Sequence, residues 1–303
     1  MRMNFAGLPA RHLVHQGKVA AALGNTAVQA LLQHFLPQPP RPLSLPGKEL
    51  TARVLPRSPA LVRDYVRHVG GDAAAYARTV PAHMFPQWSV PLAAQTLAGL
   101  PYPLLKIINS GCHLTVNAPL PAGEPLEVRA RLENVEDHGH RVLLRQRIVT
   151  GTSKCPDAIV AELSLTVAIG NGAPLGPRKQ AVCVPPGARE IAFWKLGPDA
   201  GLAFAMLTGD FNPIHWVRPY ARAFGFASTV LHGFATMARA MEGLHRGLFA
   251  GAINRIGVLG VRFTRPLLLP ARVGLYLDGR DITVGDAPGG PAYMVGRFEE
   301  ASP

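Results

Sequence analysis

Residues 207–233 of the chain read LTGDFNPIHWVRPYARAFGFASTVLHG, and this stretch carries the strongest local signals in the sequence. An apolar run from Leu202 to Leu207 precedes it with the spacing of a helix. Gly209 and the pair Asn212-Pro213 both disfavour continued helical geometry. We therefore expect a helix that ends near Thr208, followed by an irregular segment.

Two side chains that can move protons, Asp210 and His215, lie on that irregular segment and can converge there. A longer helix is expected to begin at His232–Gly233, and its free amides form a partly positive N-terminus. A carboxylate, an imidazole and a helix N-terminus suit proton transfer beside a carbonyl whose oxygen gains negative charge. The residues alone leave a second interpretation open, in which Asp210 caps a turn and His215 is a structural histidine.

The same stretch resembles the hydratase-2 signature of the MaoC-like dehydratases, the (R)-specific enoyl-CoA hydratases. The matching positions are Thr208, Gly209, Asp210, Asn212, Pro213, Ile214, His215 and Ala221, and VLHGFATMA at 230–238 resembles the start of the family's central helix. One departure is Val217, where many relatives carry an acid. The resemblance implies a hot-dog fold, in which an antiparallel sheet wraps a long helix. It also implies a hydro-lyase that interconverts trans-2-enoyl and (R)-3-hydroxyacyl thioesters in fatty acyl metabolism.

The resemblance further implies a role for each residue of the site. Asp210 and His215 correspond to the catalytic pair, which holds and activates one water. Asn212 orients the pair, and the amide of Gly233 is the oxyanion donor to the thioester carbonyl. Such chemistry needs no metal and no organic cofactor, since coenzyme A or phosphopantetheine is part of the substrate. Metal binding is disfavoured because no third ligand stands at metal-site spacing.

An internal repeat gives the second prediction. Residues 49–72 and 190–210 share one layout: a short strand, a turn with proline, and an amphipathic helix that ends in Gly-Asp. Asp72 is the counterpart of Asp210, but no Asn-Pro-x-His follows it. We therefore predict an α+β double hot-dog fold with two antiparallel sheets, each wrapped around a central helix, in which the first copy is degenerate.

The predicted organisation has four parts. They are a helical extension with a Pro-rich linker (1–46), the degenerate repeat (47–170), a linker (171–188) and the repeat that carries the motif (189–303).

Charge and composition restrict the partners. The formal net charge is +12, but the basic residues are dispersed and only 7% of residues are aromatic, which argues against nucleic acid. Coenzyme A phosphates or an acidic acyl carrier protein suit a basic rim. We consider Arg218, Arg262 and Arg265 as phosphate contacts and Trp88 as an acyl-channel residue. The alternatives are a solvated charged face for the arginines and simple core packing for Trp88.

The remaining predictions concern location and competing functions. No stretch is apolar for long enough to span a membrane and no signal peptide is evident, so we expect a cytoplasmic protein that can act alone or as a homodimer. The three cysteines fit neither a disulfide framework nor a metal site, and Cys112 fits a packed, inert thiol. Two other functions stay open: a non-catalytic acyl-thioester binding protein, and a hot-dog thioesterase, for which Glu242 on the central helix is a poor match.

Overall fold

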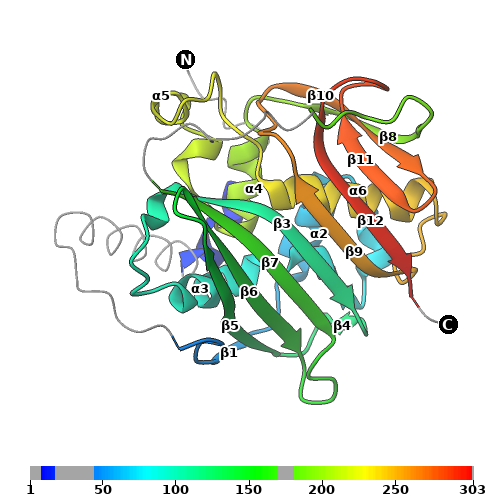
Figure 1. The fold of residues 1–303 in the computed structure, drawn as a ribbon. Coiled ribbons are helices and arrows are strands. Elements are labelled where there is room, and N and C mark those ends of the chain that lie inside the picture. The colour runs from blue at the N-terminus through cyan, green and yellow to red at the C-terminus, as the bar shows by residue number, and fades with distance from the viewer. Residues whose placement is uncertain (1–7, 18–43, 170–180, 302–303) are drawn as a thin grey trace.

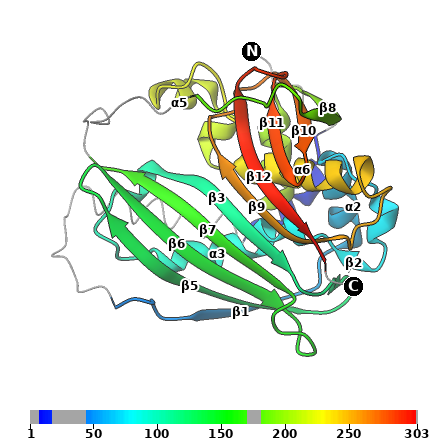
Figure 2. The same cartoon turned by 45° about the vertical axis from the view of Figure 1, so that its right-hand side comes forward.

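The computed structural model describes residues 8–17, 44–169 and 181–301 (Figure 1). A ten-stranded antiparallel sheet curves around helices on its inner face (Figures 1 and 2). In order across the sheet its strands are β1 (Leu50–Val54), β5 (Leu126–Asp137), β6 (Arg141–Gly151), β7 (Ile159–Ala168), β3 (Ile107–Val116), β9 (Ile256–Phe263), β12 (Ala292–Glu300), β11 (Asp281–Gly285), β10 (Ala271–Asp278) and β8 (Arg189–Leu196). A separate two-stranded sheet pairs β2 (Thr79–Val80) with β4 (Leu120–Pro121).

The two halves of the large sheet repeat one strand order. From the outer edge to the centre, the order β1-β5-β6-β7-β3 matches β8-β10-β11-β12-β9. The halves meet where β3 pairs with β9, with Leu114 opposite Leu259. The internal repeat is therefore present in the fold, and the two predicted sheets form one continuous sheet.

The alternation predicted for the first repeat is found in β5. Its side chains at Leu126, Val128, Ala130 and Leu132 are at most 3% exposed, while the charged residues between them face solvent in part or whole. This alternation gives the sheet one apolar face, on which the helices pack.

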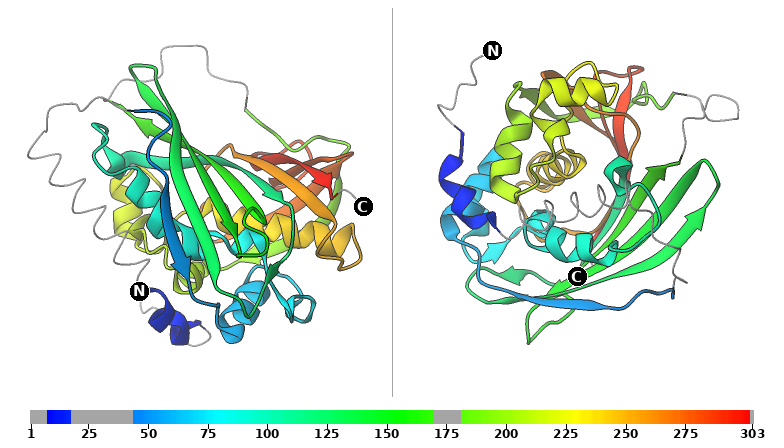
Figure 3. Two further views of the ribbon diagram at one scale, coloured as in Figure 1. Left: turned by 90° about the horizontal axis from the view of Figure 1, so that it is seen from below. Right: turned by 90° about the vertical axis from the view of Figure 1, so that its left-hand side faces the viewer.

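The helices lie mainly on that apolar face. They are α2 (Pro59–His68), α3 (Pro86–Thr96), α4 (Ala200–Thr208), α5 (Arg218–Ala223) and α6 (Gly233–Gly247), with short 3-10 helices η1 (Ala10–His15), η2 (Ala73–Tyr76), η3 (Ala82–Met84), η4 (Leu104–Lys106) and η5 (Pro213–His215). Helix α6 runs through the middle of the molecule (Figure 3), and every residue from Ala235 to His245 is buried. It is the central helix predicted from VLHGFATMA.

The first repeat differs from the second in its central helix and resembles it in the turn that carries the aspartate. Its central helix α3 has 11 residues against 15 in α6 and contains Pro91, which supplies no backbone donor. Asp72 accepts a hydrogen bond from the amide of Ala74 over 2.9 Å, much as Asp210 accepts one from Asn212. The turn is shared by both copies, whereas the histidine is not.

Three other sequence predictions have different outcomes. Of the helical extension and linker predicted for residues 1–46, only 8–17 and 44–46 belong to the described residues, and the first of these ranges contains η1. Cys112 is 3% exposed, and burial raises the pKa of its thiol, as expected for a packed and inert cysteine. In the described part of the chain, no helix combines the length and the apolar character needed to cross a membrane.

Candidate active site

The site begins with the turn after α4. Gly209 takes a left-handed conformation with φ 85°, and its amide donates to the carbonyl of Ala205 over 2.7 Å. Residues with a Cβ rarely adopt positive φ, so glycine at this position allows the sharp exit from the helix. Asp210 is therefore the first side chain beyond the helix, as the sequence predicted.

Two successive turns then lead from Asp210 to His215. Oδ1 of Asp210 accepts from the amide of Asn212 over 3.3 Å, and Oδ1 of Asn212 accepts from the amide of Ile214 over 3.2 Å. Asn212 thereby caps η5, which carries His215. Asn212 thus shapes the segment that holds the pair.

One ring nitrogen of His215 is fixed by a hydrogen bond, and the other has no hydrogen-bond partner among the described residues. Its Nδ1 lies 2.7 Å from the carbonyl oxygen of Val230. Because a carbonyl only accepts, Nδ1 must carry the proton, and in the neutral ring Nε2 keeps its lone pair. That nitrogen can accept a proton from a substrate or a water.

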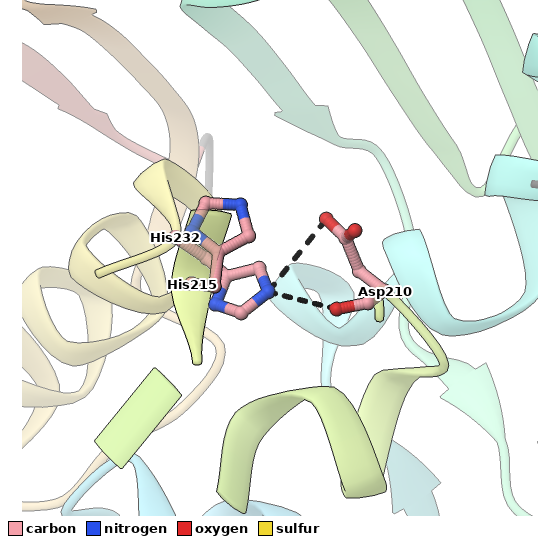
Figure 4. Close-up of side chains that lie close together, drawn as sticks. All are labelled: Asp210, His215 and His232. Atoms are coloured by element: carbon pink, nitrogen blue, oxygen red, sulfur yellow. Dashed lines mark hydrogen bonds and ion pairs between the residues drawn. The ribbon is translucent and has the colours of Figure 1, made fainter. Parts of the chain in front are cut away.

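His232 is a third member of the site that the sequence analysis treated only as a helix start. It precedes α6, and its Nε2 donates to the backbone carbonyl of Asp210 over 3.0 Å and lies 3.8 Å from the Asp210 carboxylate (Figure 4). Its ring stacks on that of His215 with centroids 3.6 Å apart. The start of the central helix is therefore tied directly to both catalytic candidates.

Burial keeps both rings neutral near pH 7. It lowers the pKa of His215, and the Asp210 carboxylate and the Val230 hydrogen bond offset this only in part. Burial and the adjacent His215 ring lower the pKa of His232 to about 3. A neutral His215 can act as a base, while the neutral His232 contributes a fixed hydrogen bond.

The three residues also form the kind of group that can bind a metal ion. One potential ligand atom from each of Asp210, His215 and His232 lies within 4.8 Å of the others, so the third ligand that spacing did not reveal is present. However, Nε2 of His232 is occupied by its hydrogen bond to Asp210. A metal also lies near the plane of each imidazole that binds it, and two rings stacked with 25° between their planes do not converge on one such point. The geometry favours proton transfer.

Gly233 stands at the N-terminus of α6, next to His232. A Cβ at this position would lie 2.8 Å from the ring of Phe263, so any larger residue would displace that ring. The first amides of a helix have no intrahelical acceptor. The amide of Gly233 is therefore available to a ligand at the position predicted for an oxyanion donor.

The three predicted arginines are placed differently. Arg218 begins α5 and is exposed, and Arg265 is exposed beyond the end of β9. Arg262 neighbours Phe263 on β9, so their side chains point to opposite faces of the sheet. Phe263 contacts Gly233, whereas Arg262 lines a groove whose described lining residues belong to strands and a loop and to no helix. The structure does not bring Arg262 to the Asp210–His215 pair.

Trp88 lies in α3 and is 4% exposed. Its Nε1 donates to Oγ1 of Thr150 on β6 over 3.1 Å. These contacts anchor α3 to the first half of the sheet, which is the core-packing alternative considered for this residue.

Two desolvated, neutral histidines, the half-buried His68 and the buried His232, predict a pH-dependent stability. Burial, followed by the nearby Arg239, lowers the pKa of His68 to about 3, the same value as for His232. Between about pH 6.5 and pH 3 the unfolded chain binds protons on both residues and the folded chain does not. Within that window the free energy of unfolding should fall by about 1.4 kcal/mol per histidine for each unit by which the pH is lowered.

Denaturant titrations at pH 7 and pH 5 measure this effect. In His68→Gln, the decrease in the free energy of unfolding from pH 7 to pH 5 should be smaller by the contribution of one histidine. Equal stability of the unmodified protein at both pH values would contradict the buried neutral state.

Comparisons with known proteins agree with this fold. Residues 180–288 match the family model of the MaoC-like domain. The chain is 28% identical over 267 residues to 3-hydroxyacyl-thioester dehydratase X of Mycobacterium tuberculosis, covering 86% of this chain and 91% of that protein. It is 21% identical over 188 residues to a probable enoyl-CoA hydratase 2 of Dictyostelium discoideum, covering 60% of this chain and 64% of that protein.

Solved structures show the same architecture. The crystal structure of HtdX from M. tuberculosis superposes with a TM-score of 0.67 at 23% identity, over 84% of this chain and all of that one. Another M. tuberculosis protein, described as having a double hot-dog fold, superposes with a TM-score of 0.58 at 13% identity, over 85% of this chain and 96% of that one. The α+β double hot-dog prediction is confirmed.

Proposed function

This chain carries a MaoC-like domain in a double hot-dog fold, and from that premise we propose that Asp210 and His215 add water reversibly to a trans-2-enoyl thioester. The protein is a hydro-lyase of fatty acyl metabolism, in line with relatives named as a 3-hydroxyacyl-thioester dehydratase and an enoyl-CoA hydratase. The observation that carries the proposal is the convergence of the carboxylate, the free Nε2 of His215 and the N-terminus of α6.

The separation within the pair suits a water molecule. Potential ligand atoms of Asp210 and His215 lie within 4.8 Å of each other, and a water with two hydrogen bonds of ordinary length bridges such a gap. Both groups accept hydrogen bonds from the water, so its two O–H groups point to the pair and an oxygen lone pair is left for the substrate. That lone pair attacks C3 of the enoyl group.

The negative charge that develops during attack needs a donor. As the C3–O bond forms, the π electrons of the C2=C3 bond shift toward C2 and the thioester carbonyl, whose oxygen becomes the enolate oxygen. The amide of Gly233, at the positive end of α6, stabilises that oxygen. In this proposal the groups that hydrate the double bond and the amide that binds the thioester oxygen lie together at the start of α6.

The Asp210–His215 pair takes up and returns the same number of protons. His215 or Asp210 takes one proton from the water as the C3–O bond forms, and the pair returns one proton to C2. The site ends in its starting protonation state, and the two side chains carry every proton transfer, so the proposed reaction requires neither a metal nor an organic cofactor. Delivery of both atoms from one side gives syn addition, and the (R)-3-hydroxyacyl product requires that the substrate bind with one particular face of C3 toward the pair.

The carrier of the acyl group is coenzyme A or an acyl carrier protein. The net charge of +12 favours either anionic partner. Arg218, three residues after His215, and Arg265 are exposed and are our candidates for phosphate contacts. Two copies of the chain forming a homodimer are compatible with the proposal and are not required by it.

The thioesterase alternative depends on Glu242, and the structure disfavours it. Glu242 is 1% exposed and accepts hydrogen bonds from Tyr76 over 2.6 Å and from His83 over 2.8 Å. Burial raises the pKa of this carboxyl, but the imidazoles of His245 and His83 outweigh burial and hold the pKa well below its usual range. Glu242 is a fully engaged core carboxylate that joins α6 to the first repeat.

Hydration assays test the proposal. Crotonyl-CoA, a longer trans-2-enoyl-CoA and a carrier-protein thioester are each incubated with the protein, and loss of the conjugated-thioester absorbance is followed. An (R)-specific dehydrogenase then reports the handedness of the product. Formation of the (R) product from at least one substrate supports the proposal, and absence of turnover on all three would favour the non-catalytic binding protein.

His232 provides a prediction of intermediate size. His232→Phe keeps an aromatic ring against His215 but loses the donor to the Asp210 carbonyl, so the pair is less well fixed. We expect turnover about 10-fold lower, because small displacements of catalytic groups are costly. His113→Phe, on the exposed histidine of β3, is the matched control and should leave turnover unchanged. Equal turnover in the two variants would show that His232 does not support the catalytic pair.

A further inference from the structure

The C-terminal end of α4 has backbone carbonyls that its own helix does not satisfy. The last four carbonyls of a helix lack intrahelical donors. Gly209 donates to Ala205, and the next turn sends the amide of Phe211 to Gly209, so the oxygens of Met206 and Leu207 receive no backbone hydrogen from beyond the helix in the described part of the chain. These carbonyls lie three to four residues before Asp210.

Gln16 supplies the missing donors. Its Nε2 donates to the carbonyl of Met206 over 3.2 Å and to that of Leu207 over 3.0 Å. Gln16 is 1% exposed although it belongs to the N-terminal segment, 190 residues before its partners. A remote segment thus acts as the side-chain cap of the helix that leads to the active site.

The orientation of the Gln16 side-chain amide is fixed by a chain of hydrogen bonds that begins at Arg57. Nη1 of Arg57 donates to Oε1 of Gln87 over 3.1 Å, and an arginine cannot accept. Gln87 must therefore present Nε2 to Oε1 of Gln16, at 3.2 Å. Gln16 is then left with Nε2 facing α4. Arg57, Gln87 and Gln16 form one relay of fixed polarity.

We propose that Gln16, oriented by Gln87 and Arg57, is a positioning residue for Asp210. The relay connects the first repeat and the N-terminal segment to the end of α4, and it holds that end where Asp210 leaves the helix. Gln16 touches no reacting atom. The proposal rests on the hydration function for its kinetic readout, but the contact itself can be tested without turnover.

Two variants test the relay. Gln16→Met keeps the length of the side chain and removes both donors. Gln87→Glu removes the donor that Gln16 Oε1 accepts, so the Gln16 amide should rotate and turn its oxygen toward the carbonyls of α4. Each should lower kcat by about 10-fold while KM changes less than about two-fold, since the relay acts on the position of Asp210 and the Gln16 side chain bonds, among the described residues, only to the end of α4 and to Gln87. The double variant should be no worse than either single one, because both break the same relay.

Controls separate positioning from general destabilisation. Gln95→Met makes the same substitution at an exposed glutamine of α3 and should leave kcat unchanged. All rates are measured well below the melting temperature of each variant. Unchanged kcat in folded Gln16→Met and Gln87→Glu, or additive losses in the double variant, would overturn the proposal.

A second readout is independent of activity. The imidazole nitrogen signals of His215 report its tautomer and surroundings by NMR, and they should shift in both variants and not in Gln95→Met. If the unmodified protein hydrates no thioester but these signals shift, the hydration function fails and the positioning role stands. If the signals stay unchanged, the positioning role fails whatever the protein catalyses.

Discussion

Asp210→Asn is expected to lower the turnover of enoyl-thioester hydration by at least about 100-fold, the range for loss of a general acid–base group. The asparagine amide can still accept from the Asn212 amide, so the turn should persist. It cannot take a proton from water at neutral pH, and one side of the water site is lost. Initial rates at saturating trans-2-enoyl thioester measure the change.

Asp72→Asn is the matched control for that variant. It makes the same substitution in the same kind of turn, since Asp72 accepts from the amide two residues ahead, as Asp210 does. Asp72 is exposed, and no histidine follows it at the spacing of His215. Turnover should be nearly unchanged. A loss as large as that of Asp210→Asn would show that the first repeat is not degenerate.

His215→Ala is expected to cost at least about 100-fold in turnover as well. It removes the free Nε2 that accepts the proton of the water, together with the hydrogen bond to Val230. The space left beside His232 should admit free imidazole, so added imidazole should restore part of the rate. Melting curves show whether the fold is intact. Normal turnover in this variant would contradict the role assigned to His215.

Local signals in the sequence were sufficient for the elements that hold the pair. Gly209 permits the left-handed geometry with which α4 ends, and Asn212-Pro213 starts the short helix that carries His215. Both effects act within a few residues, so they are visible in the chain itself. The repeat was predictable for a related reason, because the alternation along β5 and the shared Gly-Asp turns belong to single elements.

Contacts between distant segments could not be predicted in the same way. His232 reaches Asp210 only because the start of α6 packs against the turn after α4, 22 residues earlier. Gln16 reaches α4 from 190 residues away. No spacing rule covers either contact. A histidine directly before the glycine of a central helix was the single available signal for His232.

The orientation of strand residues was the other limit. Arg262 and Phe263 are adjacent, and the sequence does not say which of the two faces the helices. The register of β9 between β3 and β12 decides this, with Arg262 opposite Gly111 on one side and Val295 on the other. The result turns Phe263 toward Gly233 and Arg262 toward the outer groove.

The most direct test of the central claim is mass spectrometry of a trans-2-enoyl-CoA after incubation with the unmodified protein in oxygen-18 water. We predict an intact thioester that has gained one labelled water, with the label in the C3 hydroxyl group. A labelled free acid would instead reveal thioester hydrolysis, and an unchanged substrate would indicate binding without catalysis. Either result would contradict the assignment of Asp210 and His215 as a hydratase pair.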